Sequence, residues 1–218
     1  MPLEATAAHS GKPAGRIRQK NEEAILAAAE EEFARHGFKG TSMNTIAQAV
    51  GLPKANLHYY FSSKQGLYLA VLGNILSLWD SAFNSLHVDD DPAEALERYI
   101  RAKIEYSRRY PKASRIFAME VISGGECLSK HFGKDHQVWF RERAAVFEGW
   151  IAAGKMDPVD PMHLIFLLWG SSQYYADFAS QIASISGRSR LTKEHYQAAA
   201  DNLVQIILKG CGLRQKRP

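Results

Sequence analysis

The sequence predicts an all-α protein of about nine helices, and three observations support this fold class. Apolar residues recur every three or four positions along most of the chain. Ser, Thr and Asp-Pro mark the starts of helices, and glycines mark their ends. No convincing run of strand-like alternation interrupts this pattern. We expect a disordered tail at 1–15, a small domain at 16–65, a larger bundle at 66–212 and a tail at 213–218.

The small domain is expected to hold three helices. The first ends at Gly37 and turns one apolar face inward, formed by Ile25, Ala28, Ala29 and Phe33. The second begins after Thr41 or Ser42, either of which can cap it, and Gly51 stops it. The third begins near Pro53, because proline suits the first helical position.

The larger bundle is expected to hold the other six. Ser62 and Gln65 have the spacing of a capping box, so a helix begins there and extends to about Leu86. Three more helix starts are marked by Asp91-Pro92, by Asp160-Pro161 and by Thr192. The helix that begins at Asp160-Pro161 is long and apolar and is expected to span 161–184. A short helix, a glycine bend and a long helix fill the remaining stretch between Pro111 and Lys155.

The stretch LPKANLHYYFSSKQGL, residues 52–67, has more aromatic rings than one buried helix face can hold. Leu57 and Phe61 share the inner face, which leaves an outward set of Lys54, Ala55, His58 and Tyr59, with Tyr60 at the boundary. A cation, a small residue and polar-tipped rings suit a helix lying in the major groove of DNA. Lys64 and the basic residues Arg16, Arg18 and Lys20 can add phosphate contacts. Alternatively, the unit is a packing module whose aromatic residues cluster at an interface.

The segment FARHGFKGTSMNTIAQAVGLPKANLHYYFSSKQGLYLAVL resembles the N-terminal domain of TetR-family transcriptional regulators. It shares their G-F-x-G-T-[ST] entry, I-A-x-x-x-G turn and L-x-Y-Y-F-x-S-K-x-x-L ending. The resemblance implies a homodimer that binds double-stranded operator DNA through two recognition helices. The residues it implies to face DNA are Ser42, Met43, Lys54, Ala55, His58, Tyr59, Tyr60 and Lys64. His58 stands where many members have Tyr, and Pro53 where many have Ser, so one phosphate contact is expected to differ.

Three segments of the larger bundle resemble, within this family, the regulators of pyrimidine utilisation. They are LYLAVLGNILSLWDSAF, SRRYPKASRIFAMEVISGG and MDPVDPMHLIFLLWGSSQYYADFASQI. With the N-terminal domain, the resemblance covers most of residues 22–210. It implies a repressor that leaves its operator when uracil or thymine binds. The ligand-binding residues that it implies are Trp79, Trp169, Gln173, Tyr175 and Asp177.

The chemistry of one helical stripe is consistent with such a ligand. Phe166, Trp169, Gln173 and Asp177 follow one another at spacings of three and four, without Lys or Arg. The Gln173 amide can pair with an N–H/C=O edge of uracil, and an indole can stack on the ring. The same stripe also suits a helix core or a dimer seam. Another effector also remains open: a dihydropyrimidine, a β-amino acid or another amide-bearing metabolite. The β-amino acid is disfavoured because the stripe offers only Asp177.

Composition sets limits on other functions. A net charge of +4 and a pI near 9.0 permit an anionic partner without requiring one. The two cysteines have no metal spacing and form no disulfide framework, which indicates a reduced, cytoplasmic protein. We expect neither a signal peptide nor a membrane span. Acidic and histidine residues are scattered, with no nucleophile elbow, metal triad or phosphate loop, so no enzymatic activity, metal or cofactor is expected.

Overall fold

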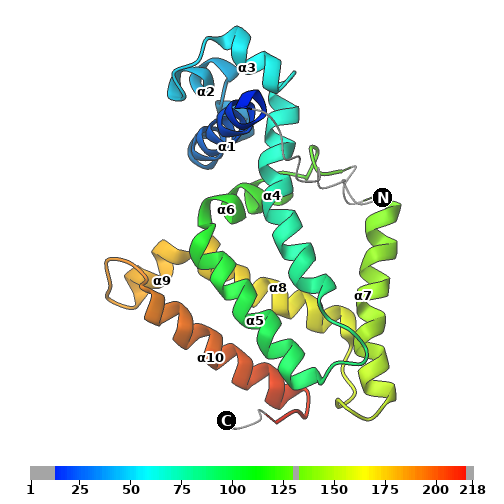
Figure 1. The fold of residues 1–218 in the computed structure, drawn as a ribbon. Coiled ribbons are helices and arrows are strands. Elements are labelled where there is room, and N and C mark those ends of the chain that lie inside the picture. Colours follow the sequence, from blue (N-terminus) through cyan, green and yellow to red (C-terminus); the bar gives the residue numbers. More distant parts are fainter. Residues whose placement is uncertain (1–12, 130–132, 215–218) are drawn as a thin grey trace.

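The computed structural model describes residues 13–129 and 133–214, which form ten helices and no strand (Figure 1). The predicted all-α class is confirmed. Most of the expected tails at 1–15 and 213–218 lies outside the described residues. Residues 13–15 belong to the first helix rather than to a tail.

Three helices build the N-terminal unit: α1 (Pro13–Gly40), α2 (Met43–Ala49) and α3 (Lys54–Tyr60). The predicted end of α1 appears as a kink, because Gly37 has a φ of 67° that disfavours other residues. Gly51 has the same positive φ and makes the tight turn between α2 and α3. This turn sets α2 and α3 at an angle to each other, in a helix-turn-helix arrangement.

The start of α2 is capped by Ser42, whose Oγ accepts from the Thr45 N–H at 3.1 Å. Thr41, the other capping candidate, is instead buried and donates its hydroxyl to the Gly37 carbonyl at 2.9 Å. The two neighbouring hydroxyls therefore have different roles. Ser42 caps the start of α2, and Thr41 binds a carbonyl at the end of α1.

A single long helix, α4 (Lys64–Asn84), joins the N-terminal unit to the rest of the molecule. The predicted capping box at Ser62 and Gln65 is wrong. The extended residue is Ser63, and its Oγ accepts from the Gly66 N–H at 3.0 Å, so the helix starts one residue later.

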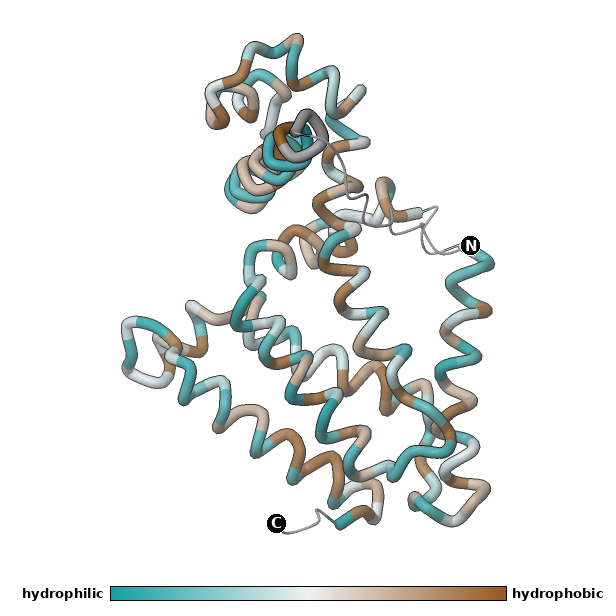
Figure 2. The backbone as a smooth tube through the Cα atoms, viewed as in Figure 1, coloured by the Kyte–Doolittle hydropathy of each residue, from teal (hydrophilic) through white to brown (hydrophobic). Residues whose placement is uncertain are grey.

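Two apolar cores meet along α4, and Figure 2 shows hydrophobic positions along this helix with hydrophilic ones between them. Its first half, including Leu67 and Leu72, packs in the N-terminal core, whereas Phe83 packs in the core of the larger bundle. Within the described ranges, α4 is the one helix long and apolar enough to cross a membrane, with 39% of its apolar window buried. A core helix of a soluble protein passes the same test, so this is weak support for a span.

The larger bundle contains six further helices: α5 (Pro92–Arg109), α6 (Pro111–Ile122), α7 (Lys134–Ala152), α8 (Pro161–Asp177), α9 (Ala179–Ile185) and α10 (Lys193–Gly210). Helix α5 packs between α8 and α10, and α6 bridges α1, α4 and α8. The Asp-Pro starts are confirmed, since Asp91 and Asp160 each accept a backbone N–H from the first turn of α5 and α8.

The predicted single helix at 161–184 is interrupted. Phe178 has non-helical backbone angles (φ −116°, ψ 23°) and separates α8 from α9. Two contacts hold the break: the rings of Tyr174 and Phe178 stack at 4.7 Å, and the Asp177 carboxylate is bound by Ser114 of α6. Neither Gly nor Pro marks this position, so the local sequence gave no sign of it.

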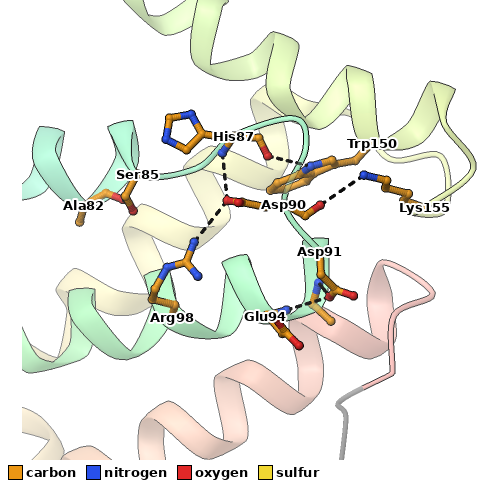
Figure 3. A network of polar contacts seen from close by, with 10 residues as sticks. Ala82, Ser85, His87, Asp90, Asp91, Glu94, Arg98, Trp150 and Lys155 are labelled. Carbon is orange, nitrogen blue, oxygen red and sulfur yellow. Dashed lines mark hydrogen bonds and ion pairs between the residues drawn. The ribbon is translucent and has the colours of Figure 1, made fainter.

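The connection between α4 and α5 is fixed by a polar network (Figure 3). Asp90 accepts from the His87 N–H at 3.1 Å and pairs with Arg98 at 3.3 Å. The buried Trp150 of α7 donates its indole N–H to the His87 carbonyl at 3.1 Å. The lower end of α4 is thereby tied to both α5 and α7.

Candidate functional site

The outward face of α3 forms the first candidate site. Leu57 is fully buried, whereas Tyr59 is 70% exposed. Lys54, Ala55 and His58 are exposed beside it. The predicted division of this helix into an inner and an outer face is therefore confirmed for these residues.

Helix α1 supports the end of α3. The Asn21 side chain donates to the Tyr60 hydroxyl at 3.0 Å, and the Arg18 guanidinium lies 5.7 Å from the Tyr59 ring centroid. Half-buried Tyr60 packs edge-on against Tyr59 at 5.3 Å. These contacts fix the direction of the outward face relative to α1. The side chain of Arg16 lies outside the described residues.

Two residues expected on this face have other surroundings. Met43 is only 8% exposed and packs in the N-terminal core. The Lys64 ammonium donates to the carbonyls of Phe38 at 2.8 Å and Thr41 at 3.0 Å, closing the end of α1. Ser42 is exposed at the start of α2. The DNA contacts expected of Met43, Lys64 and Ser42 stay predictions.

The second candidate site lies where α4 meets α5, α6 and α8. Trp79 of α4 packs edge-on against Phe117 of α6, with ring centroids 5.0 Å apart. The ammonium of Lys103, from α5, lies 4.0 Å from the centroid of the Trp79 ring. Helix α6 also carries Ser114, whose Oγ donates to the Asp177 carboxylate of α8 at 2.7 Å.

The stripe on α8 faces the same region. Trp169 packs edge-on against Phe83, one turn after Trp79 on α4, at 5.9 Å, and is hydrogen-bonded to the Tyr99 hydroxyl of α5. Gln173 is half-buried, one turn from both Trp169 and Asp177. Among the described residues it makes no side-chain hydrogen bond. Its amide is therefore a donor and an acceptor without a protein partner in that part of the chain.

Lys103 is a buried charged residue of this region that sequence reasoning missed. It is 2% exposed, and burial lowers its pKa to about 7, against the opposing attraction of Asp177 and Asp80. Burial also raises the pKa of Asp177, while the hydrogen bond from Ser114 lowers it. The signal was on α5, where Tyr99, Lys103 and Ser107 recur every four residues and so share one face. We call Trp79, Lys103, Ser114, Phe117, Trp169, Gln173 and Asp177 the interior polar cluster.

Tyr175 is not part of this cluster. Its ring faces Tyr196 of α10 at 6.4 Å, and its carbonyl accepts from the Tyr196 hydroxyl at 3.2 Å. Two surface hollows, of about 510 and 260 Å³, are lined by residues at the α4–α5 connection and between α5 and α10. They share no residue with the interior polar cluster, where the rings of Trp79 and Phe117 are in contact.

Comparison with known proteins matches two family models to successive parts of the chain. Residues 25–71 match the model of bacterial regulatory proteins of the tetR family, and residues 72–214 match the YcdC-like protein C-terminal region. The HTH-type transcriptional regulator RutR of Escherichia coli K12 is 40% identical over 201 residues, which cover 92% of this chain and 94% of RutR. This chain belongs to the TetR family.

Other known proteins extend the comparison. The HTH-type transcriptional repressor NicS of Pseudomonas putida is 31% identical over 102 residues, covering 46% of this chain and 48% of NicS. The structure of SCO4942 from Streptomyces coelicolor has a TM-score of 0.67 at 22% identity, covering 88% of this chain and 98% of that one. AibR, solved with isovaleryl coenzyme A and operator DNA, has a TM-score of 0.58 at 23% identity, covering 85% and 96%. These structures share the fold.

The family makes this protein a DNA-binding transcriptional regulator, with α2 and α3 as its helix-turn-helix and α3 as the recognition helix. Helices α4 and α6 join the N-terminal unit to the interior polar cluster. Both helices contact the N-terminal unit and carry members of the cluster.

Proposed function

We propose that this TetR-family protein represses genes of pyrimidine metabolism and leaves its operator when a pyrimidine such as uracil or thymine binds in the interior polar cluster. The observation that carries the proposal is that Trp79 of α4 and Asp177 of α8, far apart in the sequence, both lie close to the buried Lys103 of α5. The 40% identity to RutR across nearly the whole chain supports a shared function.

The chemistry of the cluster fits a small planar amide. Trp79 and Trp169 offer faces for stacking, and the Gln173 amide offers one donor and one acceptor for a ring edge. Lys103 adds a donor for a carbonyl oxygen. The rings of Trp79 and Phe117 are in contact across α4 and α6, and the Ser114–Asp177 hydrogen bond joins α6 to α8. A ligand that stacks on Trp79 would change the packing between these helices.

Helix α6 supplies a route from the cluster to the DNA-binding unit. On one side, Ser114 and Phe117 contact cluster residues of α8 and α4. On the other side, Lys112 pairs with Glu31 of α1, and Ile116 is buried in the N-terminal core. A displacement of Phe117 by a ligand then moves α1 and α4 together, and with them the recognition helix. Ligand and operator bind with opposed preference, and the coupling is reciprocal.

The proposal includes a homodimer. Leu167 and Tyr174 lie seven residues apart on one face of α8, at 54% and 44% exposure, and α10 exposes Ile206 at 58%. Large exposed apolar side chains on two long neighbouring helices fit the four-helix dimer seam that the family uses. In such a dimer, the two recognition helices enter successive major grooves about 34–36 Å apart.

Lys103 also favours a second candidate effector, a β-amino acid. A zwitterion needs a buried cation for its carboxylate and a buried carboxylate for its ammonium. Lys103 and Asp177 supply both charges across the same cluster. The α8 stripe alone offered only Asp177, but Lys103 of α5 adds the cation that a β-amino acid needs.

A panel of ligands tests the proposal. Uracil, thymine, dihydrouracil, cytosine and β-alanine are each titrated calorimetrically into the protein. We expect uracil and thymine to bind most tightly and cytosine weakly, since its ring edge presents a different pattern of donors and acceptors. Tightest binding by β-alanine would support the second candidate. If uracil and thymine bind no better than an unrelated heterocycle, the pyrimidine assignment is wrong.

A further inference from the structure

Lys103 is a buried charge whose surroundings do not fully compensate for the loss of water. It is 2% exposed, and its ammonium faces the Trp79 ring at 4.0 Å. A lysine is almost never fully buried without a charged or functional partner, because transferring its charge from water is costly. The aromatic face attracts the cation but replaces only part of its hydration.

The charged and titratable groups around Lys103 come from three other helices. Asp80 of α4 and Asp177 of α8 favour its charged form, and Arg115 of α6 acts on Asp177. On α5 itself, Tyr99 is buried with a raised pKa. Helix α10 packs against another side of α5, where Asp201 pairs with Arg101.

Desolvation exceeds these attractions. The pKa of Lys103 falls to about 7, with burial as the largest cause. The Asp177 carboxylate is already engaged by the Ser114 hydroxyl at 2.7 Å, and burial disfavours its charge as well. Near neutral pH, the ligand-free protein is therefore a mixture of molecules with neutral and charged Lys103.

We propose that Lys103 donates a hydrogen bond from its ammonium to a carbonyl oxygen of the effector, so that effector binding takes up a proton from solvent. This deepens the proposed function and rests on it. An ammonium donates to a carbonyl oxygen more strongly than a neutral amine does, so the bound effector stabilises the charged form. The proton that the amine gains comes from the buffer, and no covalent bond of the effector changes.

The inference assigns separate roles within the interior polar cluster. Gln173 reads an N–H/C=O edge, Trp79 offers its ring face, and Lys103 binds an oxygen that carries partial negative charge. Rings whose oxygen is replaced by hydrogen or by an amino group lose the Lys103 contact. Affinity for the correct ring falls as pH rises above 7, by up to about tenfold per pH unit.

Isothermal titration of uracil in two buffers with different ionisation enthalpies measures the proton uptake. At about pH 8, where the ligand-free lysine is mostly neutral, we expect uptake approaching about one proton per uracil, and less at about pH 6. Lys103→Arg stays charged at both pH values, so it should bind uracil without uptake. Lys103→Met should bind more weakly and also without uptake, and Lys209→Met, an exposed lysine of α10, should match the wild type.

The outcomes separate the two proposals. Uracil binding with no proton uptake at either pH overturns the role of Lys103 and leaves the pyrimidine assignment standing. Uptake that persists in Lys103→Arg also overturns it, because the proton then goes to another group. If no pyrimidine binds at any pH, the proposed function fails and the inference fails with it.

Discussion

The ammonium of Lys103 lies 4.0 Å from the centroid of the Trp79 ring, in the interior where the DNA-binding unit joins the larger bundle. Trp79 belongs to α4, the helix that leads directly from the recognition helix. The contact therefore places a titratable group and a stacking surface together on the path between the two sites.

Lys103→Met is expected to raise stability at neutral pH. A lysine with a pKa of about 7 in the folded state and 10.5 as its ordinary value binds fewer protons when folded. The wild type is therefore destabilised most below pH 7, and the penalty shrinks as pH rises from 7 towards 10.5. Urea unfolding should show the variant more stable by on the order of a few kcal/mol at neutral pH, with a smaller difference at higher pH. An unchanged difference across this range would contradict a depressed pKa.

Gln173→Ala is expected to weaken effector binding without affecting operator binding. Loss of one hydrogen-bonding edge to a neutral ligand corresponds to roughly threefold to tenfold in affinity. Calorimetric titration with uracil measures the loss. Tyr175→Phe is the matched control, since its ring faces α10, and should bind as the wild type does. An equal loss of uracil affinity in both variants would contradict the assignment of Gln173, and not Tyr175, to the effector site.

Lys54→Ala is expected to weaken binding to all DNA sequences and to reduce the salt dependence of binding by about one unit of slope. Lys54 is exposed at the start of the recognition helix. Fluorescence anisotropy at several salt concentrations measures both effects, using operator fragments selected from a random pool. Lys209→Ala removes an exposed lysine from α10 and should leave the slope unchanged. If the salt dependence of DNA affinity is unchanged in Lys54→Ala, Lys54 does not contact a DNA phosphate.

Ser63→Ala is expected to destabilise the protein by about 1 kcal/mol, because Ser63 caps the start of α4. Ser62→Ala is the matched control one residue earlier and should change little, although the sequence pattern favoured Ser62 as the cap. Thermal unfolding compares the two variants. A larger loss in Ser62→Ala would restore the capping box predicted from sequence.

The sequence predicted local features well where spacing alone decides them. The outward set on α3 follows from four-residue spacing around Leu57, and the starts of α5 and α8 follow from Asp-Pro. Helix periodicity indicates which face of a helix is apolar, and capping residues indicate where a helix starts. Both signals come from residues close together in the sequence.

Features set by distant residues were missed. Met43 is buried in the N-terminal core and Lys64 binds the carbonyls of Phe38 and Thr41, and neither contact was predicted from sequence. The break at Phe178 lies beside the hydrogen bond between Asp177 and Ser114, which are 63 residues apart in the sequence. Lys103 was overlooked because a charged residue was not expected on the buried face of α5. Each of these depends on packing between helices, which single-sequence patterns do not report.

The central claim is that effector and operator oppose each other through one protein, and reciprocal titration tests it most directly. Operator affinity is measured by anisotropy with and without saturating uracil, and uracil affinity by calorimetry with and without operator. We predict that each ligand weakens the other by the same factor, because binding coupling is reciprocal. Tight binding of uracil with no change in operator affinity would contradict the claim.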